Sequence, residues 1–180
     1  MAHIPGMIRA MAAVPCVHLA DPQANVREIV ELLRQADAQN VRLCVFPELC
    51  LCGYTCADLL IHPPLLSGCL QALDTLLQAP VRAAFVVGLP LEIGGRLYNC
   101  AVAVCGGRIL GVVPKTHLPG SCEFYEKRWF EPGHSAPESM TLCGQTVPVG
   151  GDLVFDCGLF SFGVELCEDL WVPAPPSAKL

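Results

Sequence analysis

Apolar and polar positions along the first quarter of the chain follow a strand, helix, strand order. Every second residue from 8 to 14 is apolar, which is typical of a half-buried strand. Asp21 and Pro22 form an N-cap followed by proline, and apolar residues then recur at helical spacing to about Asn40. Residues 43–46 are all apolar, as in a buried central strand. This order favours a parallel strand pair with a right-handed crossover.

The middle of the chain adds a second helix and an antiparallel meander. Two prolines at 63–64 open the helix, and its apolar stripe ends at Leu77. Glycine pairs at 94–95 and 106–107 predict tight turns between apolar runs. The strands of the meander are expected at Ala83–Leu89, Leu97–Cys105 and Arg108–Val113. We expect a loop over Pro119–Met140, then short strands near Leu153–Phe155 and Leu159–Val164. The pattern predicts a mixed α/β fold with helices on at least one face of a sheet.

Composition narrows the class of protein. A length of 180 residues fits one domain, and 53% hydrophobic with 16% charged residues excludes intrinsic disorder. The net charge is −6 and no run of Lys or Arg occurs, so nucleic acid and anionic membranes are not expected partners. We also expect no bilayer span, because that takes ~20 consecutive apolar residues. The proline-rich stretch after Trp171 suggests that the chain is part of a larger domain.

The 12 cysteines do not indicate a disulfide framework. They fall below the roughly 8–10% of residues that marks such scaffolds, and no pair has CxxC spacing. The tightest group is Cys50, Cys52 and Cys56, and no His pair with zinc-ligand spacing accompanies it. We therefore expect reduced cysteines, no metal site and a cytoplasmic location.

Three polar residues follow predicted strands and suggest a catalytic site. Glu48, Lys115 and Cys167 each come just after an apolar run, and ligands of α/β sheets bind at the carboxyl ends of strands. A carboxylate there can accept a thiol proton, an ammonium can stabilise an oxyanion, and the thiolate can attack a carbonyl carbon. Taken singly, each residue is more often a cap, a surface lysine or a core cysteine.

The local sequences around these residues resemble a known family. Three segments resemble the glutamate, lysine and cysteine motifs of the nitrilase (carbon–nitrogen hydrolase) superfamily, in the family order: Phe46–Tyr54, Val113–Pro119 and Gly163–Trp171. Residues 53–60 and 123–130 are similar to the glutaminase domain of bacterial glutamine-dependent NAD synthetases. The resemblance extends from Ile8 to Ser177.

The resemblance implies an α/β fold of the nitrilase type, an α-β-β-α sandwich that here ends after the nucleophile strand. Residues 1–180 would be the N-terminal part of a nitrilase/glutaminase domain. The rest of that domain and an ATP-using synthetase domain are absent from this sequence. Two alternatives remain: a free-standing amidase of the same superfamily acting on another small amide, or an inactive truncated chain that acts only with a longer subunit.

The resemblance also implies a role for each residue of the site. Cys167 would attack the side-chain amide of glutamine to form a γ-glutamyl thioester, with Glu48 as general base and then acid. Lys115 would hold the oxyanion together with the backbone N–H of Glu168. Glu126 would orient Lys115 or the substrate.

Further substrate contacts and partners follow from the same resemblance. Ser121 stands six residues beyond the lysine, where these glutaminases place a tyrosine against the glutamine. The glutaminase step would need no metal or organic cofactor, whereas ATP and Mg²⁺ belong to the missing domain. Expected partners are glutamine, an ammonia-accepting synthetase domain and further copies of the protein. Tyr54 is expected to pack at a bend, and Glu165 and Asp169 to act as supporting or capping groups.

Overall fold

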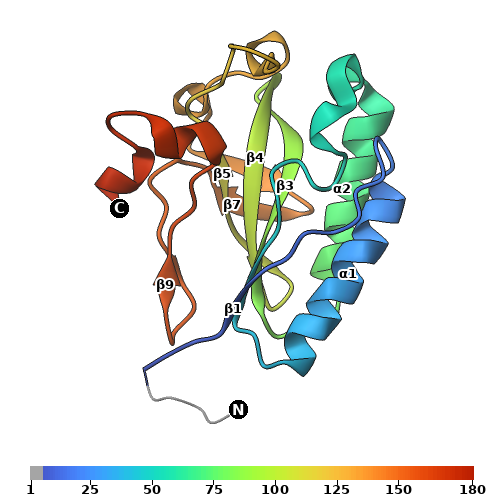
Figure 1. Ribbon diagram of the computed structural model, residues 1–180, viewed down its shortest axis with the longest axis vertical. Helices are drawn as coiled ribbons and strands as arrows, with labels where there is room; N and C mark the ends of the chain where they lie inside the picture. The colour runs from blue at the N-terminus through green and yellow to red at the C-terminus, as the bar shows by residue number, and fades with distance from the viewer. Residues whose placement is uncertain (1–5) are drawn as a thin grey trace.

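The computed structural model describes residues 6–180, and a five-stranded sheet lies at its centre (Figure 1). The strand order is β1-β2-β3-β4-β5, in which β1, β2 and β3 are parallel and β4 runs antiparallel to both of its neighbours. The bounds are β1 (Ala10–Ala12), β2 (Leu43–Val45), β3 (Ala84–Ile93), β4 (Arg96–Cys105) and β5 (Arg108–Pro114). The predicted parallel pair and the meander are confirmed. β1 is shorter than predicted because it pairs only with the three residues of β2.

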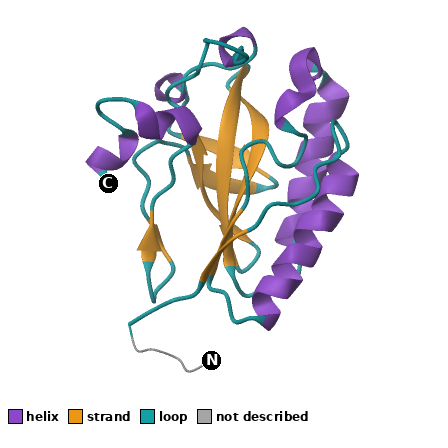
Figure 2. Cartoon of the chain, in the orientation of Figure 1, coloured by secondary structure: helices purple, strands orange, loops and turns teal. Residues whose placement is uncertain are grey.

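Two helices cover one face of this sheet (Figure 2): α1 (Pro22–Ala38) and α2 (Pro63–Leu77). The predicted start of α1 is confirmed, because the Asp21 side chain accepts a hydrogen bond from the Ala24 N–H at 2.9 Å. Ile29 and Leu33 of α1 are fully buried against the sheet, in one cluster with Leu89 of β3. The helical layer therefore follows from amphipathic spacing alone.

The segment after β5 departs most from the sequence-based expectations. β6 (Ser139–Leu142) and β7 (Gln145–Pro148) form a hairpin beside β5, whereas the sequence predicted a loop ending at Met140 and no strand at β7. The hairpin is turned by Cys143 and Gly144, both with positive φ, and Leu142 and Val147 are buried. Contact with β5 stabilises a pair whose own sequence shows no clear alternation.

The expected strands before Cys167 are mostly irregular backbone. Only β8 (Phe155–Asp156) and β9 (Ser161–Phe162) form, and they pair with each other and not with the central sheet. The short strand expected near Leu159–Val164, before Cys167, therefore forms only at Ser161–Phe162. The glycines at 158 and 163 weaken strand pairing there. Among residues 6–180 there are also five short 3₁₀ helices: η1 (Tyr54–Ile61), η2 (Glu126–Arg128), η3 (Gly133–Ser135), η4 (Cys167–Trp171) and η5 (Pro176–Lys179).

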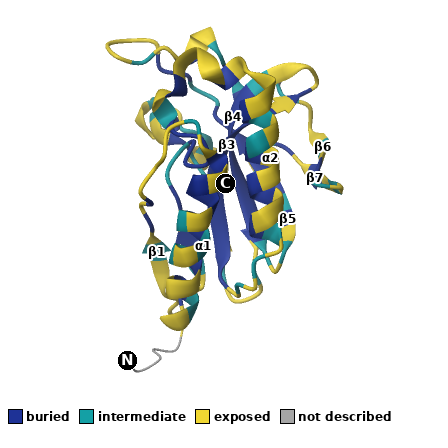
Figure 3. Ribbon diagram, turned by 90° about the vertical axis from the view of Figure 1, so that its right-hand side faces the viewer, coloured by how far each residue is buried: buried dark blue, intermediate teal, exposed yellow. Residues whose placement is uncertain are grey.

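The two faces of the sheet differ in how much they bury. Figure 3 looks onto the helix-covered side, where the strands behind α1 and α2 are buried. The helix-covered face belongs to the main core, whereas the opposite face carries a smaller cluster that includes Val86, Ala101, Phe155 and Leu166. The C-terminal segment lies on that second side (Figure 1). Residues 6–180 thus form one helical layer on a central five-stranded sheet, with two small two-stranded sheets beside it, a mixed α/β fold. Within that range no helix is long and apolar enough to cross a membrane.

Candidate active site

Sheet topology brings the predicted catalytic residues to one edge. Glu48 lies three residues after β2 ends, and Lys115 directly follows β5. β2 and β5 both run antiparallel to β4, so their carboxyl ends lie at the edge where β4 begins. Asn99, near the start of β4, is therefore at the same edge, and its carbonyl accepts a hydrogen bond from the Lys115 N–H at 2.8 Å.

A buried ion cluster joins these residues. Lys115 Nζ lies 2.7 Å from Glu48 Oε1 and 2.6 Å from Glu126 Oε1. The Lys115 side chain is 0% exposed, that of Glu126 2% and that of Glu48 17%. Asn99 Nδ2 donates to both carboxylates, and Tyr54 Oη donates to Glu126 Oε1 at 2.6 Å. Charged groups this deeply buried persist only when they are paired in this way.

The pKa values of Lys115 and Glu48 are both raised in this cluster. Burial alone would lower the pKa of Lys115, but its hydrogen bonds with Glu126 and Glu48 raise that pKa overall. Burial raises the pKa of Glu48, and the charge of Glu126 adds to the rise, although Lys115 opposes it. Lys115 thus stays an ammonium ion, while Glu48 is shifted toward the protonation range that a general acid–base needs.

Cys167 opens η4 and faces the same space as Glu48. It adopts a left-handed backbone conformation with φ of +46°, and its side chain is exposed. A cavity of about 230 Å³ is lined by both Cys167 and Glu48, with Val86 and Ala101 among its apolar walls. Burial raises the pKa of the thiol, while the Lys115 charge and a hydrogen bond with the Glu168 backbone N–H lower it. A nucleophile and a carboxylate therefore line one cavity, and the buried ammonium of Lys115 is bonded to that carboxylate.

Two glycines let the catalytic backbone pack this closely. A Cβ on Gly88 would lie 2.7 Å from the Pro47 carbonyl oxygen, beside Glu48. A Cβ on Gly133 would lie 3.0 Å from the carbonyl oxygen of Lys115, which accepts the Gly133 N–H at 2.7 Å. Any side chain at these positions would displace the backbone next to Glu48 or Lys115.

The six predicted site residues take four kinds of position. Glu48 and Cys167 line the cavity, and Lys115 and Glu126 are buried behind Glu48. Glu168 is half-buried and contributes its backbone N–H to the thiol of its neighbour. Ser121 is exposed and is not among the residues around the cavity.

Sequence reasoning missed three contributors to this site. Asn99 donates to both carboxylates, and its only signal is an amide inside a largely apolar strand. Tyr54 was expected to pack at a bend, and its hydroxyl also bonds to Glu126. Asp169, expected to be a capping group, accepts hydrogen bonds from the backbone just beyond Lys115. Their roles depend on contacts between segments far apart in the chain.

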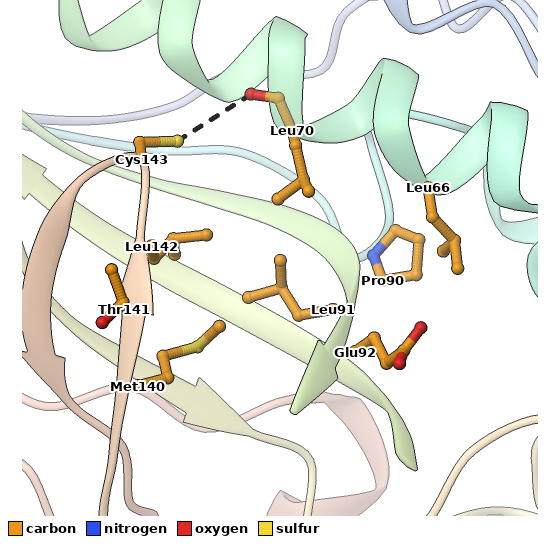
Figure 4. Close-up of a pocket in the computed structure, with 9 residues that line it drawn as sticks. All are labelled: Leu66, Leu70, Pro90, Leu91, Glu92, Met140, Thr141, Leu142 and Cys143. Atoms are coloured by element: carbon orange, nitrogen blue, oxygen red, sulfur yellow. Dashed lines mark hydrogen bonds between the residues drawn. The ribbon is translucent and has the colours of Figure 1, made fainter. Parts of the chain in front are cut away.

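A second cavity, of about 320 Å³, lies between α2, β3 and β6 (Figure 4). Leucines and Met140 dominate its lining, and the Cys143 thiol approaches the Leu70 carbonyl at 3.9 Å. Burial raises the pKa of Cys143, and the Asp74 charge raises it further. No lysine, arginine or histidine is among the described residues that line it, so its thiol has no cation to stabilise a thiolate or an oxyanion. The chemistry of this space does not match that of a nucleophile site.

The twelve cysteines, all in the described part of the chain, are free. Across positions 6–180, no cluster of three or more His, Cys, Asp or Glu side chains is arranged to hold a metal ion.

Comparison with known proteins shows which family the chain belongs to. The carbon–nitrogen hydrolase family model matches residues 10–176, nearly the whole chain. The chain therefore belongs to the carbon–nitrogen hydrolase family, which confirms the resemblance found in its motifs and the nitrilase-type fold.

The individual relatives reported next are all glutamine-dependent NAD(+) synthetases. The chain is 39% identical over 179 residues to the glutamine-dependent NAD(+) synthetase of Mycobacterium tuberculosis, covering 97% of this chain and 26% of that protein. Two solved glutamine-dependent NAD(+) synthetases share its fold. The one from Cytophaga hutchinsonii has a TM-score of 0.83 at 27% identity, over 89% of this chain and 28% of that chain. The one from Acinetobacter baumannii has a TM-score of 0.76 at 30% identity, over 93% and 29%. The chain thus spans about a quarter of the length of these relatives.

Proposed function

We propose that this chain contributes the glutaminase activity of a glutamine-dependent NAD synthetase, hydrolysing the side-chain amide of glutamine. The observation that carries this proposal is the cavity shared by Cys167 and Glu48, with Lys115 bonded directly behind Glu48. The similarity to glutamine-dependent NAD(+) synthetases supports glutamine as the substrate.

In the first half-reaction, Glu48 accepts the proton of the Cys167 thiol and the thiolate attacks the amide carbon. Two N–H groups of Lys115 bond to carboxylates, which leaves the third for the oxyanion of the tetrahedral intermediate. The backbone N–H of Glu168, next to the thiol, is the second donor. Glu48 then gives its proton to the departing nitrogen, and ammonia leaves a γ-glutamyl thioester on Cys167.

In the second half-reaction, water attacks the thioester while Glu48 takes a proton from it. The proton then returns to the Cys167 sulfur, and glutamate leaves. Glu126 keeps Lys115 charged and fixed throughout, because its carboxylate is almost fully buried and accepts from both Lys115 and Tyr54. These side chains supply nucleophile, base and oxyanion donor themselves, so the proposed step uses no metal or organic cofactor.

The ammonia would pass to an ATP- and Mg²⁺-using synthetase domain that converts deamido-NAD to NAD. We place this reaction in the cytoplasm, where free cysteines stay reduced. Self-association of the full protein is part of the proposal and is supported by the exposed Leu170 and Trp171 (57% and 76%).

The experiment is an assay of ammonia release from glutamine by the full natural chain, with Cys167→Ala and Cys50→Ala as the paired variants. Cys50 is buried and its pKa is raised to about 12 by burial, so it is a matched thiol that cannot act. We expect loss of activity only in Cys167→Ala, and labelling of Cys167 by a glutamine-mimicking electrophile. Labelling of Cys50 instead would overturn the assignment. Turnover of other small amides but not of glutamine would favour a free-standing amidase, and no turnover at all would favour an inactive chain.

A further inference from the structure

A buried aspartate ties the nucleophile turn to the lysine segment. Asp169 is 1% exposed and lies two residues after Cys167 in η4. Its Oδ1 accepts the backbone N–H of His117 at 2.7 Å and lies 2.9 Å from the His117 ring nitrogen Nδ1. Its Oδ2 accepts the backbone N–H of Thr116 at 3.2 Å. Because Thr116 adjoins Lys115, one carboxylate joins the two sides of the site.

The turn that carries the thiol depends on this attachment. The Asp169 N–H bonds to the Leu166 carbonyl at 3.0 Å, which closes the backbone around Cys167. Cys167 itself adopts the left-handed conformation, which is strained for a non-glycine residue and persists only where surrounding contacts enforce it. Residues 163–166, just before it, are outside any strand, so the sheet does not hold the turn from that side. The bonds from Asp169 to Thr116 and His117 supply that constraint.

We propose that Asp169 is a positioning residue that holds the Cys167 thiol at the correct distance from Lys115 and Glu48. This inference rests on the proposed function, in which Cys167 is the nucleophile. Asp169 acts through the backbone: it fixes the lysine segment on one side and the nucleophile turn on the other. Its loss would leave all three reacting groups present and would change only their spacing. A misplacement of about 1 Å in such a group lowers the rate by roughly 100-fold.

The chain offers a matched control. Asp37, at the end of α1, also accepts backbone N–H groups from another segment, those of Arg82 and Ala83 at 3.0–3.1 Å. It joins α1 to the start of β3, at the sheet edge opposite the catalytic residues. Asp37→Ala therefore removes the same kind of link without touching the nucleophile turn.

The test compares Asp169→Ala, Asp169→Asn and Asp37→Ala in the full natural chain with glutamine. Asp169→Ala is expected to lower kcat about 10- to 100-fold and to change KM for glutamine less than about threefold. Asparagine keeps an oxygen that accepts the His117 backbone N–H and loses only the acceptor for the Thr116 N–H, so Asp169→Asn should retain at least about a third of kcat. Asp37→Ala should keep the parental kcat. The proposal is overturned if Asp169→Ala leaves kcat unchanged. It is also overturned if Asp37→Ala lowers kcat as much as Asp169→Ala does.

A second readout does not require turnover. Alkylation of Cys167 by iodoacetamide is followed by peptide mass spectrometry, with exposed Cys16 and Cys122 as internal references. We expect Asp169→Ala to slow labelling of Cys167 several-fold relative to both references, because the thiol moves away from the Lys115 charge that favours its thiolate. If the labelling rate of Cys167 relative to Cys16 and Cys122 is unchanged in Asp169→Ala, the proposal is contradicted. If neither the parent protein nor any variant hydrolyses glutamine but this relative rate falls, the proposed function fails while the positioning role stands.

Discussion

Replacing Lys115 with methionine tests what the buried ammonium contributes to the fold. Its Nζ lies 2.7 Å from Glu48 and 2.6 Å from Glu126, and its side chain has no exposed surface. Methionine fills a similar volume without charge, so Lys115→Met leaves two carboxylates facing each other. Removing one partner of a buried ion pair costs about 3–5 kcal/mol, because the remaining charge is uncompensated. Tyr54 and Asn99 still donate to Glu126, so we expect the lower end of that range, about 3 kcal/mol.

The loss has a definite pH dependence. Burial raises the folded-state pKa of Glu48 above its ordinary value of 4.5, and Lys115 opposes that rise. Without Lys115 the folded-state pKa rises further, so the folded protein holds a proton that the unfolded chain has released. Stability then falls as the pH rises from 4.5 through the folded-state pKa. Lys115→Met is therefore closest in stability to the parent protein under acidic conditions and most destabilised at neutral pH.

Guanidinium unfolding at several pH values measures this effect, with the fluorescence of Trp129 and Trp171, the chain's two tryptophans, as the signal. Lys127→Met is the control, because Lys127 is exposed and its replacement should change stability by less than about 0.5 kcal/mol. A loss below about 1 kcal/mol for Lys115→Met at neutral pH would refute the reasoning, since a buried pair broken on one side costs more than that. A loss that grows toward acidic pH would refute it equally.

Two further substitutions test how the site is built. Gly88→Ala places a Cβ against the backbone beside Glu48, so we expect about 1–3 kcal/mol of destabilisation and a lower kcat, measured by unfolding midpoint and ammonia release. A Cβ at Gly120 would meet only a lysine side chain, at 3.4 Å, so Gly120→Ala should change neither the stability nor kcat. Equal effects of Gly88→Ala and Gly120→Ala would contradict the packing explanation. The family resemblance places an aromatic ring against glutamine at position 121, although Ser121 is exposed and outside the cavity lining. On that resemblance, Ser121→Tyr adds an aromatic surface worth about 1–3 kcal/mol, so KM for glutamine should fall roughly ten- to hundredfold with kcat little changed. An unchanged KM would show that Ser121 does not face the substrate.

Local chemistry explains why the sequence alone predicted so much of the scaffold. The Asp21-Pro22 start of α1 and the glycine pairs between the middle strands act through their immediate neighbours. Strand direction then follows from the helical crossover between β2 and β3 and from the tight turns after β3 and β4, and it brings Glu48 and Lys115 to one edge. These features need no knowledge of distant contacts, and the structure agrees with them.

Tertiary structure decided the parts that depend on distant contacts. Tyr54 reaches Glu126 across 72 positions, and Asp169 reaches His117 across 52, and neither separation produces a periodic signal in the sequence. The β6–β7 hairpin and the irregular backbone before Cys167 likewise depend on what β5 and the neighbouring segments contact. The sequence by itself determined which chemical groups are present and which sheet edge receives Glu48 and Lys115. Only the folded chain determined how those groups are paired, because burying charged groups requires specific partners from several elements at once.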